Sequence, residues 1–99
     1  MIKPLPISFP RNFEFIAGDA VSNGIKQRKR RANLFTAVSL NSLYATPCWI
    51  WVAGADQCIA IYGQVIAFSD RQVIMEGGVV VPTTAVCKVE LPDARLYLS

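Results

Sequence analysis

The sequence predicts an all-β fold: a small antiparallel sandwich of jelly-roll type, or a small barrel, with an extended N-terminal arm. Short apolar segments recur along the chain, and turn residues separate them about every eight to twelve positions, which is typical of sandwiches and barrels. From Ala32 to Ser69 the only charged residue is Asp56. Strands with so little charge are expected to be covered on both faces. No segment shows a clear helical period, although residues 19–29 could form one or two loose turns.

The length of the chain fits one domain. Its 99 residues divide into an extended arm over residues 1–12 and a single β domain over residues 13–99. A domain of this size has a large surface for its volume, so little chain is left to cover its own strands. We therefore expect copies of the protein, or a larger assembly, to cover the remaining apolar faces.

Proline residues define the N-terminal arm. Each proline fixes φ, removes a backbone donor and holds the residue before it in an extended conformation. The apolar residues between them would contact one surface, either on this domain or on a neighbouring subunit. The prolines are Pro4, Pro6 and Pro10, and the candidate interface residues are Leu5, Ile7 and Phe9.

Two strands and a basic loop are predicted in the first half of the β domain. The strands are short alternating runs bounded by glycine, asparagine or proline. In the second strand, Leu34, Val38 and Leu40 are expected to face inward together with Thr36. The strands span residues 13–17 and 34–40, the loop spans 26–31, and the breaks lie at 18–19, 23–24, 41–42 and 45–47.

The second half is predicted to consist of short strands joined by tight turns. Residues 48–53 place Trp49 and Trp51 on one strand face and smaller apolar residues on the other. Gly63 bends or divides a strand over residues 58–68. The other expected elements are turns at 54–56 and 69–70, a hairpin of 73–75 with 79–81 through Gly77-Gly78, and strands at 86–91 and 96–98. In the strand at 86–91, Lys88 and Glu90 are expected to face water and three residues to face inward: Cys87, Val89 and Leu91.

Positive charge is concentrated in one short run. The chain has 10 basic and 7 acidic residues, a net charge of +3, and five of the basic residues fall within residues 26–31. Such a run can neutralise phosphates and release their counterions. Two other interpretations remain open: a solvated loop that keeps the protein soluble, and docking on an acidic partner. The candidate contacts for nucleic acid or an acidic partner are Lys26, Arg28, Lys29, Arg30 and Arg31.

Aromatic residues form a second candidate set. Trp49 and Trp51 share one strand face, and Tyr62 and Phe68 are expected nearby. Exposed rings beside a basic run are typical of proteins that stack the bases of single strands. Tryptophans in a charge-poor strand are also typical of cores and subunit interfaces, which is the interpretation we favour. The four aromatic residues are therefore candidate interface anchors.

No catalytic set is visible, and we expect that the protein is not an enzyme. Histidine is absent, which removes the common general base and the triads that contain it. Asp56 follows Gly54-Ala55, which favours a turn. We expect no cofactor and no metal, because Cys48, Cys58 and Cys87 lack metal-site spacing, and a cysteine-held metal is the weakest alternative. Free thiols in a reducing compartment are expected, with a Cys48–Cys58 bridge left open.

Neither a signal peptide nor a membrane span is predicted. Prolines interrupt the N-terminal residues, where a signal peptide would need an apolar segment. The longest apolar stretch, residues 47–55, is much shorter than the about 20 residues of a membrane helix. We therefore expect no membrane partner and synthesis in the cytoplasm.

Four segments follow one another in a recognisable order: NLFTAVSLNS at 33–42, ATP at 45–47, WIWV leading to the aspartate at 49–56, and GGVVVPTT at 77–84. In this order the chain resembles small jelly-roll-like structural proteins, decoration or minor capsid, of tailed-phage particles. The resemblance covers about half of the chain, and residues 57–71 depart from it because they lack a proline-glycine turn. It implies association with a bacteriophage capsid, often in copies around a symmetry axis, and no enzymatic residues.

These observations favour a virion structural protein: a capsid decoration, minor capsid or connector-type subunit that self-associates and docks on a larger particle. The expected partners are copies of itself, other capsid or particle proteins and packaged nucleic acid. The expected location is the virion, which is assembled in the host cytoplasm. The alternative is a small β-barrel that binds single-stranded nucleic acid, with residues 26–31 along the backbone and three stacking residues, Trp49, Trp51 and Tyr62.

Overall fold

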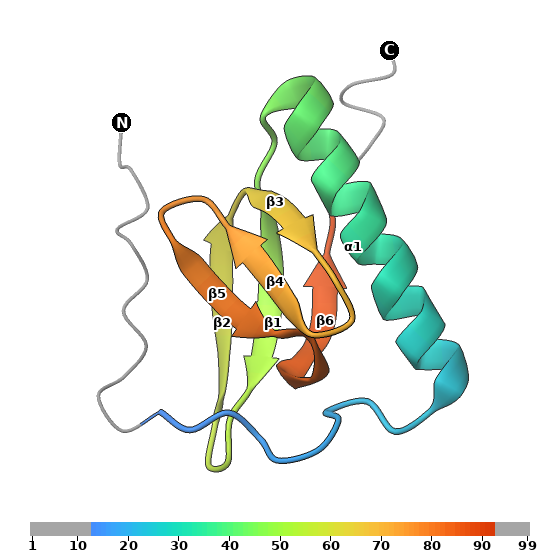
Figure 1. Ribbon diagram of the computed structural model, residues 1–99, viewed down its shortest axis with the longest axis vertical. Coiled ribbons are helices and arrows are strands. Elements are labelled where there is room, and N and C mark those ends of the chain that lie inside the picture. The colour runs from blue at the N-terminus through green and yellow to red at the C-terminus, as the bar shows by residue number, and fades with distance from the viewer. Residues whose placement is uncertain (1–12, 93–99) are drawn as a thin grey trace.

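The computed structural model describes residues 13–92 of the chain. In this part, one long helix precedes six short strands, and a 3₁₀ turn lies before the last strand (Figure 1). The fold is therefore rich in strands but not all-β, and it is neither a jelly roll nor a closed barrel. The elements are α1 (Gly24–Tyr44), β1 (Cys48–Ala53), β2 (Cys58–Gly63), β3 (Val65–Phe68), β4 (Gln72–Met75), β5 (Val79–Pro82), the 3₁₀ turn η1 (Thr83–Ala85) and β6 (Val86–Glu90).

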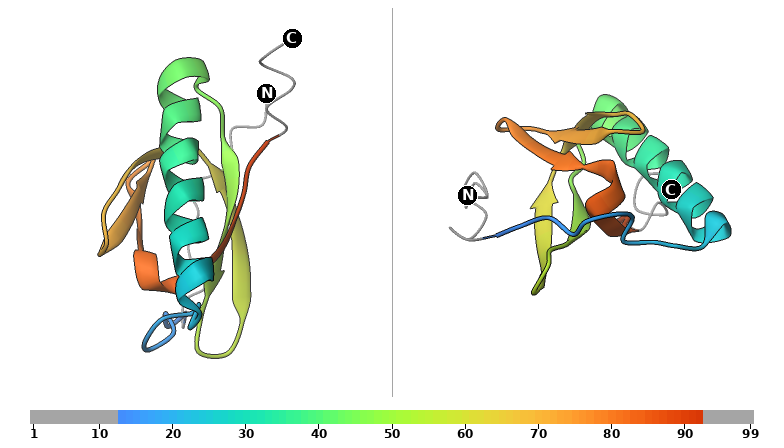
Figure 2. Two further views of the ribbon diagram at one scale, coloured as in Figure 1. Left: turned by 90° about the vertical axis from the view of Figure 1, so that its right-hand side faces the viewer. Right: turned by 60° about the horizontal axis from the view of Figure 1, so that its bottom comes forward.

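Two antiparallel sheets of three strands each make up the β part, with strand orders β2-β1-β6 and β3-β4-β5. Only Gln64 separates β2 from β3, so one bent strand passes from the first sheet to the second. Gly63 allows a close approach at this bend, since a Cβ there would lie 3.2 Å from the Met75 Cε. The sheets lie on either side of α1 in Figure 2, and α1 contacts β3 in one sheet and β6 in the other.

Helix α1 corrects the prediction for the first half of the domain. Residues 26–31, expected as a loop, and residues 34–40, expected as a strand, both lie in the helix. Asn23, expected in a turn, is the N-cap: its side chain accepts hydrogen bonds from the backbone N–H groups of Ile25 (2.8 Å) and Lys26 (3.4 Å). The helix continues through the expected break at 41–42 and ends at Ala45, whose φ is +51°.

Helical spacing explains which side of α1 faces the core. Leu34 and Ala37 are fully buried, and Arg30 and Asn41, which lie on the same side, are largely and partly buried. Thr36, which the strand prediction turned inward, is exposed. The core joins this helix face to both sheets through large buried side chains: Leu34, Ile50, Ile61, Met75, Val52, Val65, Val73, Val81 and Val86.

The strand predictions for the second half are largely confirmed. β1 spans the predicted residues, with Trp49 and Trp51 on the face opposite the core, and β4 pairs with β5 as the expected hairpin. Gly77 and Gly78 form its turn with φ values of +90° and +82°, where side chains are rarely tolerated. β6 differs from the predicted alternation: Val86 and Val89 are buried, whereas Cys87 is half-buried where the pairing with β1 shifts register.

The segment before α1 crosses the end of β1 without forming the predicted strand. Of residues 13–17, only Phe15 pairs, in a single bridge to Gly54. A Cβ at Gly54 would lie 2.6 Å from the Phe13 ring, so this contact requires glycine. The arm with Leu5, Ile7 and Phe9, and the strand expected at 96–98, lie outside the described residues.

Candidate nucleic-acid interface

The basic run occupies the first two turns of α1, and the helix sends its members in different directions. Lys26, Arg28 and Lys29 are exposed and make no ion pair or side-chain hydrogen bond with any residue in 13–92. Arg31 is exposed and its Nη1 lies 3.0 Å from the Asp70 carboxylate. Arg30 points inward, and its side chain is 10% exposed.

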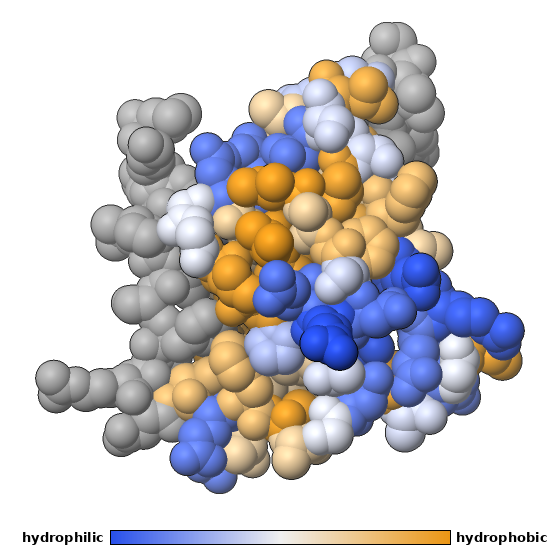
Figure 3. Space-filling view, in the orientation of Figure 1, coloured by the Kyte–Doolittle hydropathy of each residue, from blue (hydrophilic) through white to orange (hydrophobic). Residues whose placement is uncertain are grey.

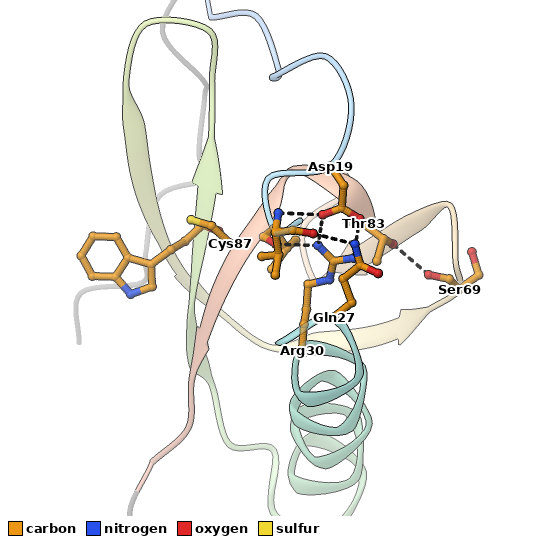
Figure 4. A network of polar contacts seen from close by, with 9 residues as sticks. Asp19, Gln27, Arg30, Ser69, Thr83 and Cys87 are labelled. Atoms are coloured by element: carbon orange, nitrogen blue, oxygen red, sulfur yellow. Dashed lines mark hydrogen bonds and ion pairs between the residues drawn. The ribbon is translucent and has the colours of Figure 1, made fainter. Parts of the chain in front are cut away.

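Arg30 attaches the start of the helix to the rest of the domain (Figure 4). Its Nη1 and Nη2 donate to the two carboxylate oxygens of Asp19 at 2.8 and 3.0 Å, and Nη1 also donates to the Val86 carbonyl at 3.0 Å. The hydrogen bond from Arg30 holds the pKa of Asp19 below its ordinary value, against the opposing effect of burial, and the Val21 N–H adds to the lowering. Arg30 is thus a structural residue that fixes α1 against β6.

Two other polar contacts lie near the same end of the helix. Gln27 Nε2 donates to the Val21 carbonyl at 2.6 Å, and the Thr83 hydroxyl donates to the Ser69 carbonyl at 2.8 Å (Figure 4). The first contact ties α1 to the segment before it, and the second ties η1 to the turn between β3 and β4. The cations are therefore presented on a fixed support.

The dipole of α1 adds to their positive charge. The first turn contains no acidic residue, and the partial positive charge of a helix N-terminus lies where the cations are concentrated. In Figure 3 the hydrophilic surface gathers at the lower right, over the first turns of α1. This end of the molecule is an electropositive surface.

Two grooves flank Arg30. The β3-side groove, about 290 Å³, lies between α1, η1 and the β3–β4 turn, and its charged lining residues are three arginines and two aspartates: Arg28, Arg30, Arg31, Asp19 and Asp70. The β6-side groove, about 260 Å³, lies between α1 and β6. No carboxylate of residues 13–92 lines it, and its lining residues are Val21, Lys26, Lys29, Arg30, Asn33, Cys87, Lys88 and Val89. Unbalanced positive charge is therefore concentrated in the β6-side groove.

The outer surface of the sheet β2-β1-β6 carries the aromatic face, which we define as Trp49, Trp51 and Tyr62. Trp49 and Tyr62 stand opposite each other on β1 and β2, with ring centroids 4.9 Å apart, and are 41% and 40% exposed. Trp51 is half-buried, and its Nε1 is buried without a hydrogen-bond acceptor among the described residues. Lys88 stands opposite Trp51 on β6, with Nζ 6.0 Å from the ring centroid. The aromatic face therefore borders the β6-side groove at Lys88.

The remaining predicted residues lie elsewhere. Phe68 is half-buried, packs against the core and lines the β3-side groove. Cys48 and Cys58 lie at opposite ends of the β1–β2 hairpin, so the alternative of a bridge between them is wrong, and all three cysteines are free. Burial raises the pKa of Cys48 to about 11. Residues 13–92 contain no cluster of metal-ligating side chains.

Lys88 and Asn33 belong to this surface but were not among the predicted site residues. Lys88 was predicted only as a solvent-facing strand residue, and Asn33 was placed next to a strand. Helical spacing in residues 26–33 would have put Lys26, Lys29 and Asn33 on one face. Nothing in the sequence pattern indicates that this face packs beside Lys88.

Comparisons with protein families, curated proteins and solved structures found no match for this chain. Among the described residues, no helix combines the length and apolar character that crossing a membrane requires.

Proposed function

We propose that this protein binds single-stranded nucleic acid. The observation that carries the proposal is the position of Lys88, which lines the basic groove beside α1 and also lies over the Trp51 ring of the aromatic face. Cations for a phosphate backbone and exposed rings for bases thus form one continuous surface. This combination is typical of single-strand binding, in which a basic groove follows the backbone and rings stack the bases.

Exposure of the rings decides between stacking and a core role. Trp49 and Tyr62 each expose about two fifths of their surface on the outer side of a sheet, so the core does not use these faces. Only unpaired bases can stack on protein rings, which favours a single strand over a duplex. Because every base has a π-face, we expect affinity with little sequence preference.

Tryptophan fluorescence tests this function. An oligothymidylate within the usual site size of about 4–16 nucleotides is expected to quench the emission at low salt, and added salt should reverse the effect. Trp49→Ala should weaken binding by about 5- to 150-fold, since one stacked base contributes roughly 1–3 kcal/mol. Phe35→Ala is the matched control, because Phe35 is also exposed (67%) but lies on the outer side of α1. Absence of binding by the unmodified protein would refute the proposal.

A structural subunit of a virus particle, acting by self-association, is the second candidate. It is favoured by three apolar side chains on the outer side of α1: Ile25, Phe35 and Leu43 are 70%, 67% and 72% exposed. The bent strand β2–β3 also gives the strands one continuous order, β6-β1-β2/β3-β4-β5, which ends at β6 and β5. Pairing of β5 in one copy with β6 in the next would be a heterologous contact, the kind that closes into rings.

Sedimentation velocity over a range of protein concentrations tests the second candidate. Self-association predicts a defined oligomer or larger assemblies, and Phe35→Ser with Leu43→Ser should shift these toward the monomer if the outer side of α1 is the interface. A monomer at every concentration argues against this candidate and leaves nucleic-acid binding intact. The two functions are compatible in one protein. The fluorescence measurement therefore tests only nucleic-acid binding, and sedimentation tests only self-association.

A further inference from the structure

We propose that the β6-side groove is the phosphate-binding subsite of this protein, and that a bound strand passes from it over Lys88 to the aromatic face. This inference rests on the proposed function and adds the location and direction of the bound backbone. The β3-side groove is excluded from that path.

Hydrogen-bond donors on α1 are aligned along the β6-side groove. Lys26, Lys29 and Asn33 are spaced by three and four residues, so they lie above one another on the side of the helix that borders the groove. Neither lysine is paired within the described residues, and the Asn33 amide makes no side-chain hydrogen bond there. Two ammonium groups and one amide donor, all without a partner among the described residues, thus border the β6-side groove. Phosphate oxygens accept hydrogen bonds from both kinds of donor.

The opposite side of the groove also carries a positive charge. β6 contributes Lys88 across from the helix, and no aspartate or glutamate in the described part of the chain lines the space between them. Glu90 does approach Lys88 at 3.7 Å, but both side chains are well exposed, so this ion pair costs little to exchange for a phosphate contact. Lys88 is therefore free to turn toward either the groove or the Trp51 ring.

The two grooves differ in the carboxylates that line them. In the β3-side groove, Asp19 and Asp70 pair with Arg30 and Arg31, which leaves Arg28 as the only lining cation without a carboxylate partner among the described residues. A phosphate there would meet two carboxylates. Arg30, held in place by its ion pair, also lines the β6-side groove, but its partner Asp19 does not. Repulsion between like charges thus directs the backbone to the β6 side.

Two triple variants of equal charge test the path. The groove variant is Lys26→Gln/Lys29→Gln/Lys88→Gln, and the matched control is Arg28→Gln/Arg31→Gln/Arg71→Gln. Arg71 is an exposed residue of the β3–β4 turn and does not line the β6-side groove. Both remove three positive charges, so a difference between them reports position instead of net charge. Affinity for a labelled oligothymidylate is measured at several salt concentrations, and circular dichroism confirms that each variant is folded.

The groove variant is expected to lose about 10- to 100-fold in affinity and to lower the slope of log K against log salt by about 2, since each phosphate contact on a single strand contributes about 0.7. The control should change the slope by less than about 1. Equal effects of the two variants, or a larger effect of the control, would overturn the subsite while leaving nucleic-acid binding standing. Failure of the unmodified protein to bind would overturn both.

A charge placed inside the groove provides a second measurement. Asn33→Asp should weaken oligonucleotide binding about tenfold by opposing the phosphate, whereas Ser42→Asp, on the same helix but far from the groove, should leave binding unchanged.

Competition with polyglutamate, a polyanion without phosphates or bases, tests which kind of polymer the groove recognises. If polyglutamate displaces the oligonucleotide at equal charge concentration, the groove recognises acidic peptide instead, and the assignment to a nucleic-acid backbone is wrong.

Discussion

Arg30 differs from the four neighbouring cations of α1 because its guanidinium is almost out of solvent and holds both oxygens of Asp19. The sequence presents five equivalent positive charges, and only the helix geometry separates this one from the rest. Its charge is used inside the protein, where it also binds the Val86 carbonyl. Lys26 and Lys29, on the helix that Arg30 fixes, have no ion-pair partner among the described residues.

Asp19→Asn is expected to lower the free energy of unfolding by about 2 kcal/mol at neutral pH, because it leaves a largely buried guanidinium without its carboxylate. The folded pKa of Asp19 is lowered by Arg30. The stabilisation is therefore present above the ordinary aspartate pKa of about 3.9 and is lost as pH falls through the lower folded value. Urea unfolding at neutral and acid pH should show the variant and the unmodified protein converging in acid.

Asp70→Asn is the control for this prediction. Asp70 pairs with Arg31 at a similar distance, but its side chain is 83% exposed, so its removal should change stability by less than about 1 kcal/mol. Equal losses for the two variants would show that burial of the Asp19–Arg30 pair has no special effect.

At the scale of elements, α1 begins at the N-cap Asn23 and carries five cations in its first two turns. Asn23 accepts hydrogen bonds from two backbone N–H groups, whereas the cations of the first two turns oppose the helix dipole. The N-terminal half of α1 is therefore held by its cap and by tertiary contacts such as Gln27 with Val21, against its own charge.

Asn23→Ala should accordingly lower stability by about 1 kcal/mol through the lost cap. Asn23→Asp should keep the cap and match or exceed the original stability, since a carboxylate favours both the dipole and the nearby cations. Chemical unfolding followed by circular dichroism compares the three proteins. If the aspartate variant is as weak as the alanine variant, the cap is not what holds this end of the helix.

The strands were predictable and the helix was not, for a physical reason visible in α1. In β1, a two-residue period separates Trp49 and Trp51 from the core side, and Gly54 marks the turn that follows the strand. In α1, the inward-facing position of the first turns is Arg30, which interrupts the apolar stripe that identifies a helix. The residues from Leu34 to Leu40 then mimic the period of a strand. The ion pair between Arg30 and Asp19 therefore stabilises a helix where the local sequence has the two-residue period of a strand.

At the scale of the molecule, the candidate surface exists only because α1 packs beside β6. The basic run and the aromatic pair are visible as separate features of the sequence. Their connection through Lys88 depends on strand order and on where the helix lies, and neither follows from local patterns. The apolar residues on the outer side of α1 are separate from this surface and leave room for self-association.

Mapping the bound strand on the protein tests the central claim most directly. In the ¹H–¹⁵N spectrum of labelled protein, added oligothymidylate should shift two groups of signals together: the indole N–H groups of Trp49 and Trp51, and the backbone amides of Lys26, Lys29, Asn33 and Lys88. Saturation of both groups at the same ligand concentration would establish one continuous surface. Shifts confined to the outer side of α1 or to β5, with the indole signals unmoved, would contradict the account.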